Sequence, residues 1–187
     1  MSRRQDEFER VAMPHSVSLL RVARQLANDT ATAEDLVQDT LMRAWRSFDR
    51  FQAGTNAKAW LFRIMLNRFR ALARRPASRT VLVPLDHPGA EASDPGGAEF
   101  ALADAAEVAE ALGELSLEHR TVLLLGVVEG FTCRELAEIL SIPIGTVMSR
   151  ISRARRALRE RLVPANSSSR RARSAAVYPE REARELQ

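Results

Sequence analysis

The capping and apolar pattern between residues 132 and 158 restricts the fold of this chain more than any other feature. Thr132 and Glu135 form a capping box, which predicts the start of a short helix that runs to Leu140. A tight turn is expected next, and Pro143 suits the first position of a new helix, where its missing N–H costs nothing. Along that helix, apolar residues recur with helical spacing: Ile144, Val147, Ile151, Ala154 and Leu158.

A short helix, a tight turn and a long amphipathic helix form the helix-turn-helix pattern, whose second helix enters the DNA major groove. A preceding helix, which Ser116 can cap and Gly130 can end, is expected to bury Val122, Leu125 and Val128. The alternative is an ordinary helical hairpin with an arginine-rich solvated face. We favour DNA binding, because the capping box, turn, proline and one-sided arginines coincide. The candidate DNA contacts are Thr146, Ser149, Arg150, Arg153 and Arg156.

The first part of the chain predicts another amphipathic helix, at residues 32–48. Thr32 and Asp35 resemble a capping box, with aspartate in place of the usual glutamate. One face of the helix is apolar and is expected to be buried: Val37, Leu41, Ala44, Trp45 and Phe48. The opposite face is polar and, for a lone helix, predicts a solvated surface.

A further helix is expected at residues 57–74, after a loop at residues 49–56. Its core side is predicted to consist of Trp60, Leu61, Ile64 and Ala71. A second edge carries polar donors that suit a phosphate backbone, with asparagine able to read a base edge. These donors are Arg63, Asn67, Arg70 and Arg74. A basic helix edge alone also fits an ordinary surface.

The charge along the chain indicates two helical domains joined by an acidic linker. Residues 1–75 hold 14 basic and 8 acidic side chains, and Lys58 is the sole lysine among the 28 basic residues of the chain. Residues 76–106 hold one arginine, five carboxylates and several prolines and glycines, which predicts a flexible linker. Residues 107–163 form the second domain, and residues 164–187 a disordered basic tail that either solubilises the chain or adds weak nucleic-acid affinity. The fold class is therefore all-α.

Several classes of protein are excluded by what the sequence lacks. One cysteine and three scattered histidines exclude a disulfide framework and a zinc cluster. No apolar run approaches the roughly 20 residues of a membrane span. There is no P-loop and no nucleophile–base pair, so we expect no enzyme, no catalytic residue, no metal, no cofactor and a cytoplasmic location without membrane insertion. Cys133 is expected to be a small core or boundary residue rather than a redox switch.

Two stretches of the chain resemble regions 2 and 4 of extracytoplasmic-function (ECF) sigma factors, in the order found in that family. Residues 35–45 and 51–64 resemble region 2. Residues 130–137 and 143–150 resemble region 4. The resemblance covers most of residues 8–162 and implies two sigma domains that bind RNA polymerase and promoter DNA.

The resemblance to region 2 implies two surfaces. The helix at residues 32–48 corresponds to the one that docks on the clamp helices of the largest RNA polymerase subunit, which replaces the solvated-surface interpretation. Its candidate contacts are Asp35, Gln38, Asp39, Met42, Arg43 and Arg46. The loop and helix that follow correspond to the part that opens the −10 element and captures an unstacked base. The candidates there are Asn56, Lys58, Arg63, Asn67, Arg70 and Arg74.

The resemblance to region 4 implies that the helix at residues 143–162 reads the −35 element, with region 4 also contacting the polymerase flap. Met148 stands where relatives often carry arginine or lysine, so only apolar contact is expected there. The linker corresponds to the segment that relatives thread through the polymerase cleft, and its acidity either mimics nucleic acid or serves solubility. An anti-sigma partner is expected, because many members of the family have one.

The resulting functional prediction is an alternative sigma factor that binds core RNA polymerase, directs it to −10 and −35 elements and starts promoter melting in a stress response. One alternative is a stand-alone helix-turn-helix regulator, which the region 2 stretch disfavours. Another is a sigma-like decoy that binds an anti-sigma factor, which the arginine-rich recognition helix disfavours.

Overall fold

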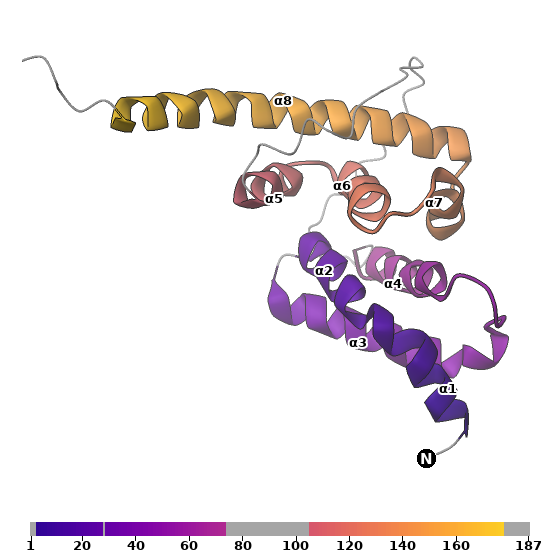
Figure 1. Ribbon diagram of the computed structural model, residues 1–187. Helices are drawn as coiled ribbons and strands as arrows, with labels where there is room; N and C mark the ends of the chain where they lie inside the picture. Colours follow the sequence, from indigo (N-terminus) through magenta and orange to yellow (C-terminus); the bar gives the residue numbers. More distant parts are fainter. Residues whose placement is uncertain (1–2, 28, 74–104, 178–187) are drawn as a thin grey trace, which may run out of the picture.

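Figure 1 shows the computed structural model, in which helices form two groups. The structure describes residues 3–27, 29–73 and 105–177, with side chains described as far as residue 162. Strands are absent from these residues, which confirms the all-α fold with two small helical domains. Most of the predicted linker, Arg74 and the last ten residues lie outside the described part. Within that part, no helix is long and apolar enough to cross a membrane.

The first group packs around a continuous apolar core. Leu19, Leu36, Leu61 and Met65 are almost fully buried where its helices meet. Aromatic rings extend this core at one end, with Phe8 edge-on to both Trp45 and Phe48 at centroid distances of 5.2 Å. The helices are α1 (Arg3–Ala12), α2 (Ser16–Leu26), α3 (Thr30–Arg46) and α4 (Ala57–Ala73), with 3-10 turns η1 (Met13–His15) and η2 (Phe48–Arg50).

The start of α3 differs from the prediction. Asp29, rather than Thr32, is the N-cap: its carboxylate accepts a hydrogen bond of 2.8 Å from the Thr32 backbone N–H. That hydrogen bond holds the pKa of the Asp29 carboxyl below its ordinary value. The predicted capping box at Thr32 and Asp35 is therefore wrong, because the helix begins two residues earlier.

The buried face of α4 is also shifted from the predicted one. Leu61 is buried as predicted, but Ala71 is exposed, while Trp60 and Ile64 are half-buried. Three residues that the sequence did not place in the core are buried instead: Phe62, Met65 and Leu66. The reason is that α4 packs against α3 in its own group and against α7 in the second group, so its buried face is wider than the apolar stripe of a surface helix.

The second group holds the predicted helix-turn-helix. Thr132 Oγ1 accepts a hydrogen bond of 3.3 Å from the Glu135 N–H, and Glu135 Oε2 accepts one of 2.8 Å from the Thr132 N–H, which confirms the capping box. Ser116 caps its helix as predicted, and Ser141 makes the tight turn at a φ of 56°. The elements are α5 (Ala105–Gly113), α6 (Leu117–Leu123), the π-helix η4 (Leu124–Val128), α7 (Cys133–Leu140) and α8 (Ile144–Val177).

A π-turn at the end of α6 changes which residues face inward. The Glu129 N–H donates to the Leu124 carbonyl at 3.0 Å, five residues back instead of four. The wider turn leaves Val128 46% exposed, although the sequence predicted it to be buried, and turns Glu129 inward instead. Val122 and Leu125 are buried as predicted.

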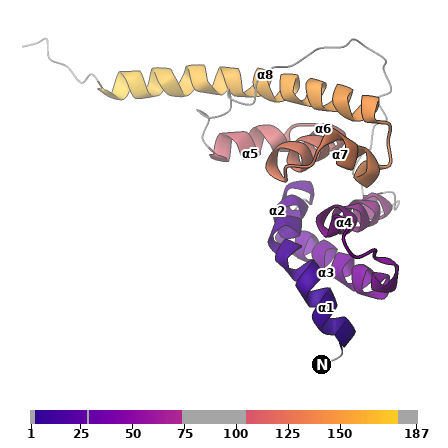
Figure 2. The ribbon, with the colours of Figure 1, turned by 45° about the vertical axis from the view of Figure 1, so that its right-hand side comes forward.

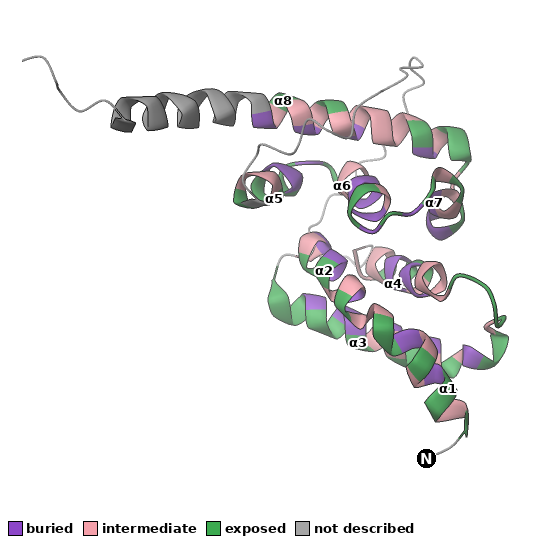
Figure 3. Ribbon diagram, viewed as in Figure 1, coloured by how far each residue is buried: buried purple, intermediate pink, exposed green. Residues whose placement is uncertain are grey.

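Helix α8 begins directly after Pro143, whose carbonyl accepts from the Val147 N–H at 3.1 Å. Val147, Ala154 and Leu158 are buried, whereas Ile144, the first residue of the helix, is exposed. Figure 3 shows the buried residues of α8 on the side that faces α5–α7. The helix continues to Val177, into the segment for which the sequence predicts a disordered tail.

The two groups contact each other where α4 packs on α7 and where α2 packs on α6. Figure 2, turned by 45°, shows the same order of layers as Figure 1: α1–α4, then α5–α7, then α8. The helix-turn-helix thus places α8 on the side of the molecule away from the first group.

Candidate polymerase and nucleic-acid interfaces

The polar face of α3 is accessible over most of its length. Asp39 alone is half-buried, because it forms ion pairs with Arg43 at 3.1 Å and with Arg68 of α4. Arg68, which the sequence analysis did not select, therefore orients this carboxylate from a neighbouring helix. The exposed candidates on this face are Asp35, Gln38, Met42, Arg43 and Arg46.

The candidate −10 residues on α4 separate into two sets. Arg63 and Asn67 are exposed one turn apart on one edge. Arg70 is half-buried and donates a hydrogen bond of 3.1 Å to the Leu140 carbonyl at the end of α7. Arg74 lies outside the described residues.

Asn56 has a structural role that was not predicted from the sequence. It caps α4: its side-chain oxygen accepts from the Ala59 N–H at 3.0 Å, and its carbonyl accepts from the Trp60 N–H at 3.1 Å. The amide nitrogen then donates to Glu135 Oε1 at 2.7 Å, across the two helical groups. Since Asn56 precedes the helix by one residue, the capping rule could have identified this task from the sequence.

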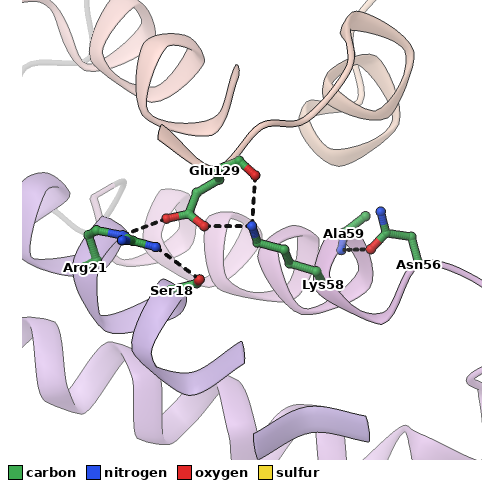
Figure 4. A network of polar contacts seen from close by, with 6 residues as sticks. All are labelled: Ser18, Arg21, Asn56, Lys58, Ala59 and Glu129. Carbon is green, nitrogen blue, oxygen red and sulfur yellow. Dashed lines mark hydrogen bonds and ion pairs between the residues drawn. The ribbon is translucent and has the colours of Figure 1, made fainter. Parts of the chain in front are cut away.

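Lys58 lies in a network centred on Glu129, shown in Figure 4. Its Nζ is 2.8 Å from Glu129 Oε2 and also 2.8 Å from the Glu129 carbonyl. Arg21 Nε donates to the other carboxylate oxygen at 3.0 Å. Burial raises the pKa of Glu129, but hydrogen bonds from Lys58 and Arg21 outweigh this and hold it below the ordinary value. Neither Glu129 nor Arg21 was predicted from the sequence. A signal for Glu129 was present, since this carboxylate follows directly after an apolar run.

The candidate −35 contacts on α8 are less exposed than the sequence predicted. Arg156 is exposed, whereas Thr146, Ser149, Arg150 and Arg153 are half-buried. Arg150 forms an ion pair of 3.0 Å with Glu118 of α6, and Ser149 Oγ donates to the Thr146 carbonyl at 3.1 Å. The first turns of α8 therefore carry a row of hydrogen-bond donors, of which Arg150 is held by its ion pair with α6.

The pKa of His119 in α6 is affected by the positive charge of this row of donors. Burial lowers the pKa of its imidazole, and the nearby Arg153 and Arg150 lower it further, against the opposing effect of Glu118. Among the described residues, no group of histidine, cysteine and carboxylate side chains could hold a metal ion. Cys133 is a half-buried free thiol.

Two domain families match this arrangement: Sigma-70 region 2 over residues 12–80 and Sigma-70, region 4 over residues 105–158. The ECF RNA polymerase sigma factor SigL of Mycobacterium tuberculosis is 39% identical over 147 residues, which cover 78% of this chain and 82% of SigL. The chain is an ECF sigma factor. CnrH of Cupriavidus metallidurans, an RNA polymerase sigma factor, is 34% identical over 160 residues, which cover 81% of this chain and 84% of CnrH.

Solved structures of sigma factors share the fold of this ECF sigma factor. RpoE of Bartonella quintana, in complex with the anti-sigma factor NepR, has a TM-score of 0.66 and 35% identity, over 83% of this chain and 96% of RpoE. CnrH in complex with the cytosolic domain of CnrY has a TM-score of 0.61 and 31% identity, over 86% of this chain and 90% of the CnrH chain. The region 2 match covers α2, α3 and α4 and begins at the last residue of α1, and the region 4 match lies within the α5–α8 group.

Proposed function

We propose that this ECF sigma factor binds core RNA polymerase, directs it to promoters with −10 and −35 elements and starts promoter melting in the bacterial cytoplasm. The observation that carries the proposal is the match to region 2 and region 4 in one chain, in that order. We assign region 2 to residues 1–75, the linker to 76–106, region 4 to 107–163 and a tail to 164–187. A sigma factor acts by binding, so no catalytic residue is proposed.

The docking surface for core polymerase is the polar face of α3. Its exposure supports the assignment, since a surface for a large partner has to be accessible in the free protein. Asp39 contributes a carboxylate that Arg43 and Arg68 hold in place. In the proposed complex, this face meets the clamp helices of the largest subunit, while region 4 meets the flap.

The promoter contacts are divided between α4 and α8. Arg63, Asn67 and Arg70, together with Asn56 and Lys58 at the start of α4, form the proposed −10 surface. Positive side chains would follow the phosphates, and asparagine would hold an unstacked base. The donors along α8, from Thr146 to Arg156, form the proposed −35 surface.

An anti-sigma factor is the proposed regulator of this protein. The support is that RpoE of Bartonella quintana was solved with the anti-sigma factor NepR, and CnrH with the cytosolic domain of CnrY. Both sigma factors share more than 30% identity with this chain. A stress response is the setting that we propose for such control.

The test of the proposed function is run-off transcription by purified bacterial core polymerase on a promoter library, with and without this protein. We expect promoter-specific transcripts only when the protein is present. Absence of transcripts together with absence of core binding would contradict the proposal. DNA binding by the isolated protein would then distinguish a stand-alone regulator from a decoy for an anti-sigma factor.

Charge reversal on α3 is expected to weaken association with core polymerase. Asp39→Arg and Asp35→Arg should each reduce affinity by at least about tenfold, because like charges placed together at an interface cost several kcal/mol. Asp35 is the cleaner position, since its side chain is exposed, whereas Asp39 is paired with two arginines. The measurement is competition for core polymerase against the wild-type protein.

The matched control is Asp49→Arg, an exposed carboxylate of the same helical group that pairs with Arg4 outside the docking face. It carries the same charge change and should retain wild-type affinity. Circular dichroism melts of all three variants check the fold. If the α3 variants and the control compete equally well, α3 is not the docking helix.

A further inference from the structure

The N-terminal end of α8 carries no charged side chain. Residues 144–149 are Ile, Gly, Thr, Val, Met and Ser, and the first arginine of the helix is Arg150. In a helix-turn-helix, the N-terminal residues of the second helix contact the base edges. The side chains that pair with guanine, adenine or cytosine by strong hydrogen bonds are arginine, lysine, asparagine, glutamine and the carboxylates. None of them stands at residues 144–149, so base reading at this end has to use other chemistry.

Two large apolar side chains are exposed at this end of the helix. Ile144 is 48% exposed and Met148 is 58% exposed. Because they are four residues apart, they lie next to each other on one edge of α8, one helical turn apart. Val147, which stands between them in the sequence, is 0% exposed and belongs to the core. We call Ile144 and Met148 the apolar tip of α8.

The surroundings of the apolar tip allow a close approach by a ligand. Gly145 is exposed, and no atom from elsewhere in the fold lies within 4 Å of the position that a Cβ on it would take. Ser149 Oγ donates to the Thr146 carbonyl at 3.1 Å, so its hydroxyl hydrogen is used within the helix. Helix α8 also lies on the side of α5–α7 away from region 2 (Figure 1). The tip therefore presents mainly apolar surface on an accessible side of the molecule.

The charge beside the apolar tip suits DNA as its ligand. Arginines begin directly after it, with Arg150 held near the tip by its ion pair of 3.0 Å with Glu118, and Arg156 exposed further along. Such a row of positive side chains complements the phosphates on either side of a groove. Within the major groove, the C5-methyl group of thymine is the feature that side chains read by apolar contact. The tip and the thymine methyl are therefore chemically complementary.

We propose that Ile144 and Met148 determine −35 specificity by contacting the methyl groups of thymines in neighbouring base pairs. This inference rests on the proposed function, in which α8 reads the −35 element, and it names the bases that this end of the helix selects. One helical turn rises about 5.4 Å, less than two base-pair steps of about 3.4 Å each, so both contacts fall within a few base pairs. The −35 element of this sigma factor therefore contains A·T pairs at these positions.

The test removes single methyl groups from the promoter. Replacing thymine by uracil deletes the C5-methyl and leaves the hydrogen-bonding pattern of the base pair unchanged. Each thymine of the −35 sequence selected by the run-off experiment is replaced in turn, and binding of the promoter by holoenzyme with the full-length chain is measured by competition. We expect uracil at the contacted positions to weaken binding by the wild type about fourfold each, the usual effect of one buried methyl group. Uracil at the other positions should have no effect.

Two protein variants assign each methyl contact to its side chain. Met148→Ala and Ile144→Ala truncate exposed residues, so the buried core of region 4 stays intact. Each variant should bind the unmodified promoter about fourfold more weakly and lose its response to uracil at one position. The salt dependence of binding should stay that of the wild type, because no phosphate contact is lost. The matched control is Met13→Ala, the same truncation at a methionine of η1 that is 44% exposed in region 2, and it should respond to uracil like the wild type.

Several outcomes would overturn the inference. A selected −35 element without A·T pairs, or wild-type binding that is indifferent to uracil at every thymine, would exclude methyl reading. Alanine variants that keep the full uracil response would show that other side chains make the contacts. Weaker binding of core polymerase by the variants, with an unchanged uracil response, would assign the apolar tip to the polymerase. If the wild-type holoenzyme does not bind the unmodified promoter, the proposed function itself is contradicted, and the inference that rests on it fails with it.

Discussion

The double variant Arg150→Ala, Arg153→Ala is expected to lose recognition of the −35 element. Each arginine that makes a bidentate base contact should cost about 1–3 kcal/mol when removed. Both residues lie near the start of α8, where a recognition helix reads base edges. Arg150 is 21% exposed and pairs with Glu118 at 3.0 Å, so its guanidinium is held near the start of the helix before DNA binds.

The measurement is holoenzyme binding to promoters with the selected −35 sequence and with a scrambled one. Loss of a base contact reduces the difference between the two sequences, whereas loss of a phosphate contact weakens both equally and lowers the salt dependence. The double variant Arg3→Ala, Arg10→Ala, at two exposed arginines of α1, removes the same two charges far from region 4. Equal promoter binding by the α8 double variant and this control would remove Arg150 and Arg153 from −35 recognition.

Leu136→Ala is expected to lower the free energy of unfolding of region 4 by about 2–5 kcal/mol, the usual cost of truncating a buried leucine. Leu136 is 0% exposed in α7. Its Cδ1 lies 3.3 Å from where a Cβ on Gly126 would stand, so it packs directly on the π-turn. The truncation therefore leaves a cavity between α7 and the π-turn.

Urea unfolding followed by circular dichroism measures this change. Glu138→Ala, at an exposed position of the same helix, should stay within about 0.5 kcal/mol of the wild type. A loss below about 1 kcal/mol for Leu136→Ala would mean that the helix-turn-helix core does not depend on this contact.

Local signals in the sequence predicted the helices well, because capping and apolar spacing act over a few residues. The capping box at Thr132 and Glu135 and the cap at Ser116 are both confirmed. The prediction at Thr32 was wrong, since Asp29 provides an equivalent cap three residues before it and moves the start of α3 to Thr30. Val128 was misplaced for another reason: the π-turn departs from the 3.6-residue period on which apolar spacing relies.

The sequence by itself determined the all-α fold, the helix-turn-helix and the polar face of α3, because each depends on periodicity within one helix or on capping at its end. Only the tertiary structure decided which polar residues are accessible. Arg63 and Arg70 carry the same side chain on one predicted edge, yet Arg63 is exposed and Arg70 is bonded to Leu140. Glu129 is bonded to Lys58 and Arg21, which lie 71 and 108 positions away in the sequence. No local spacing encodes these contacts, because packing between the two regions creates them.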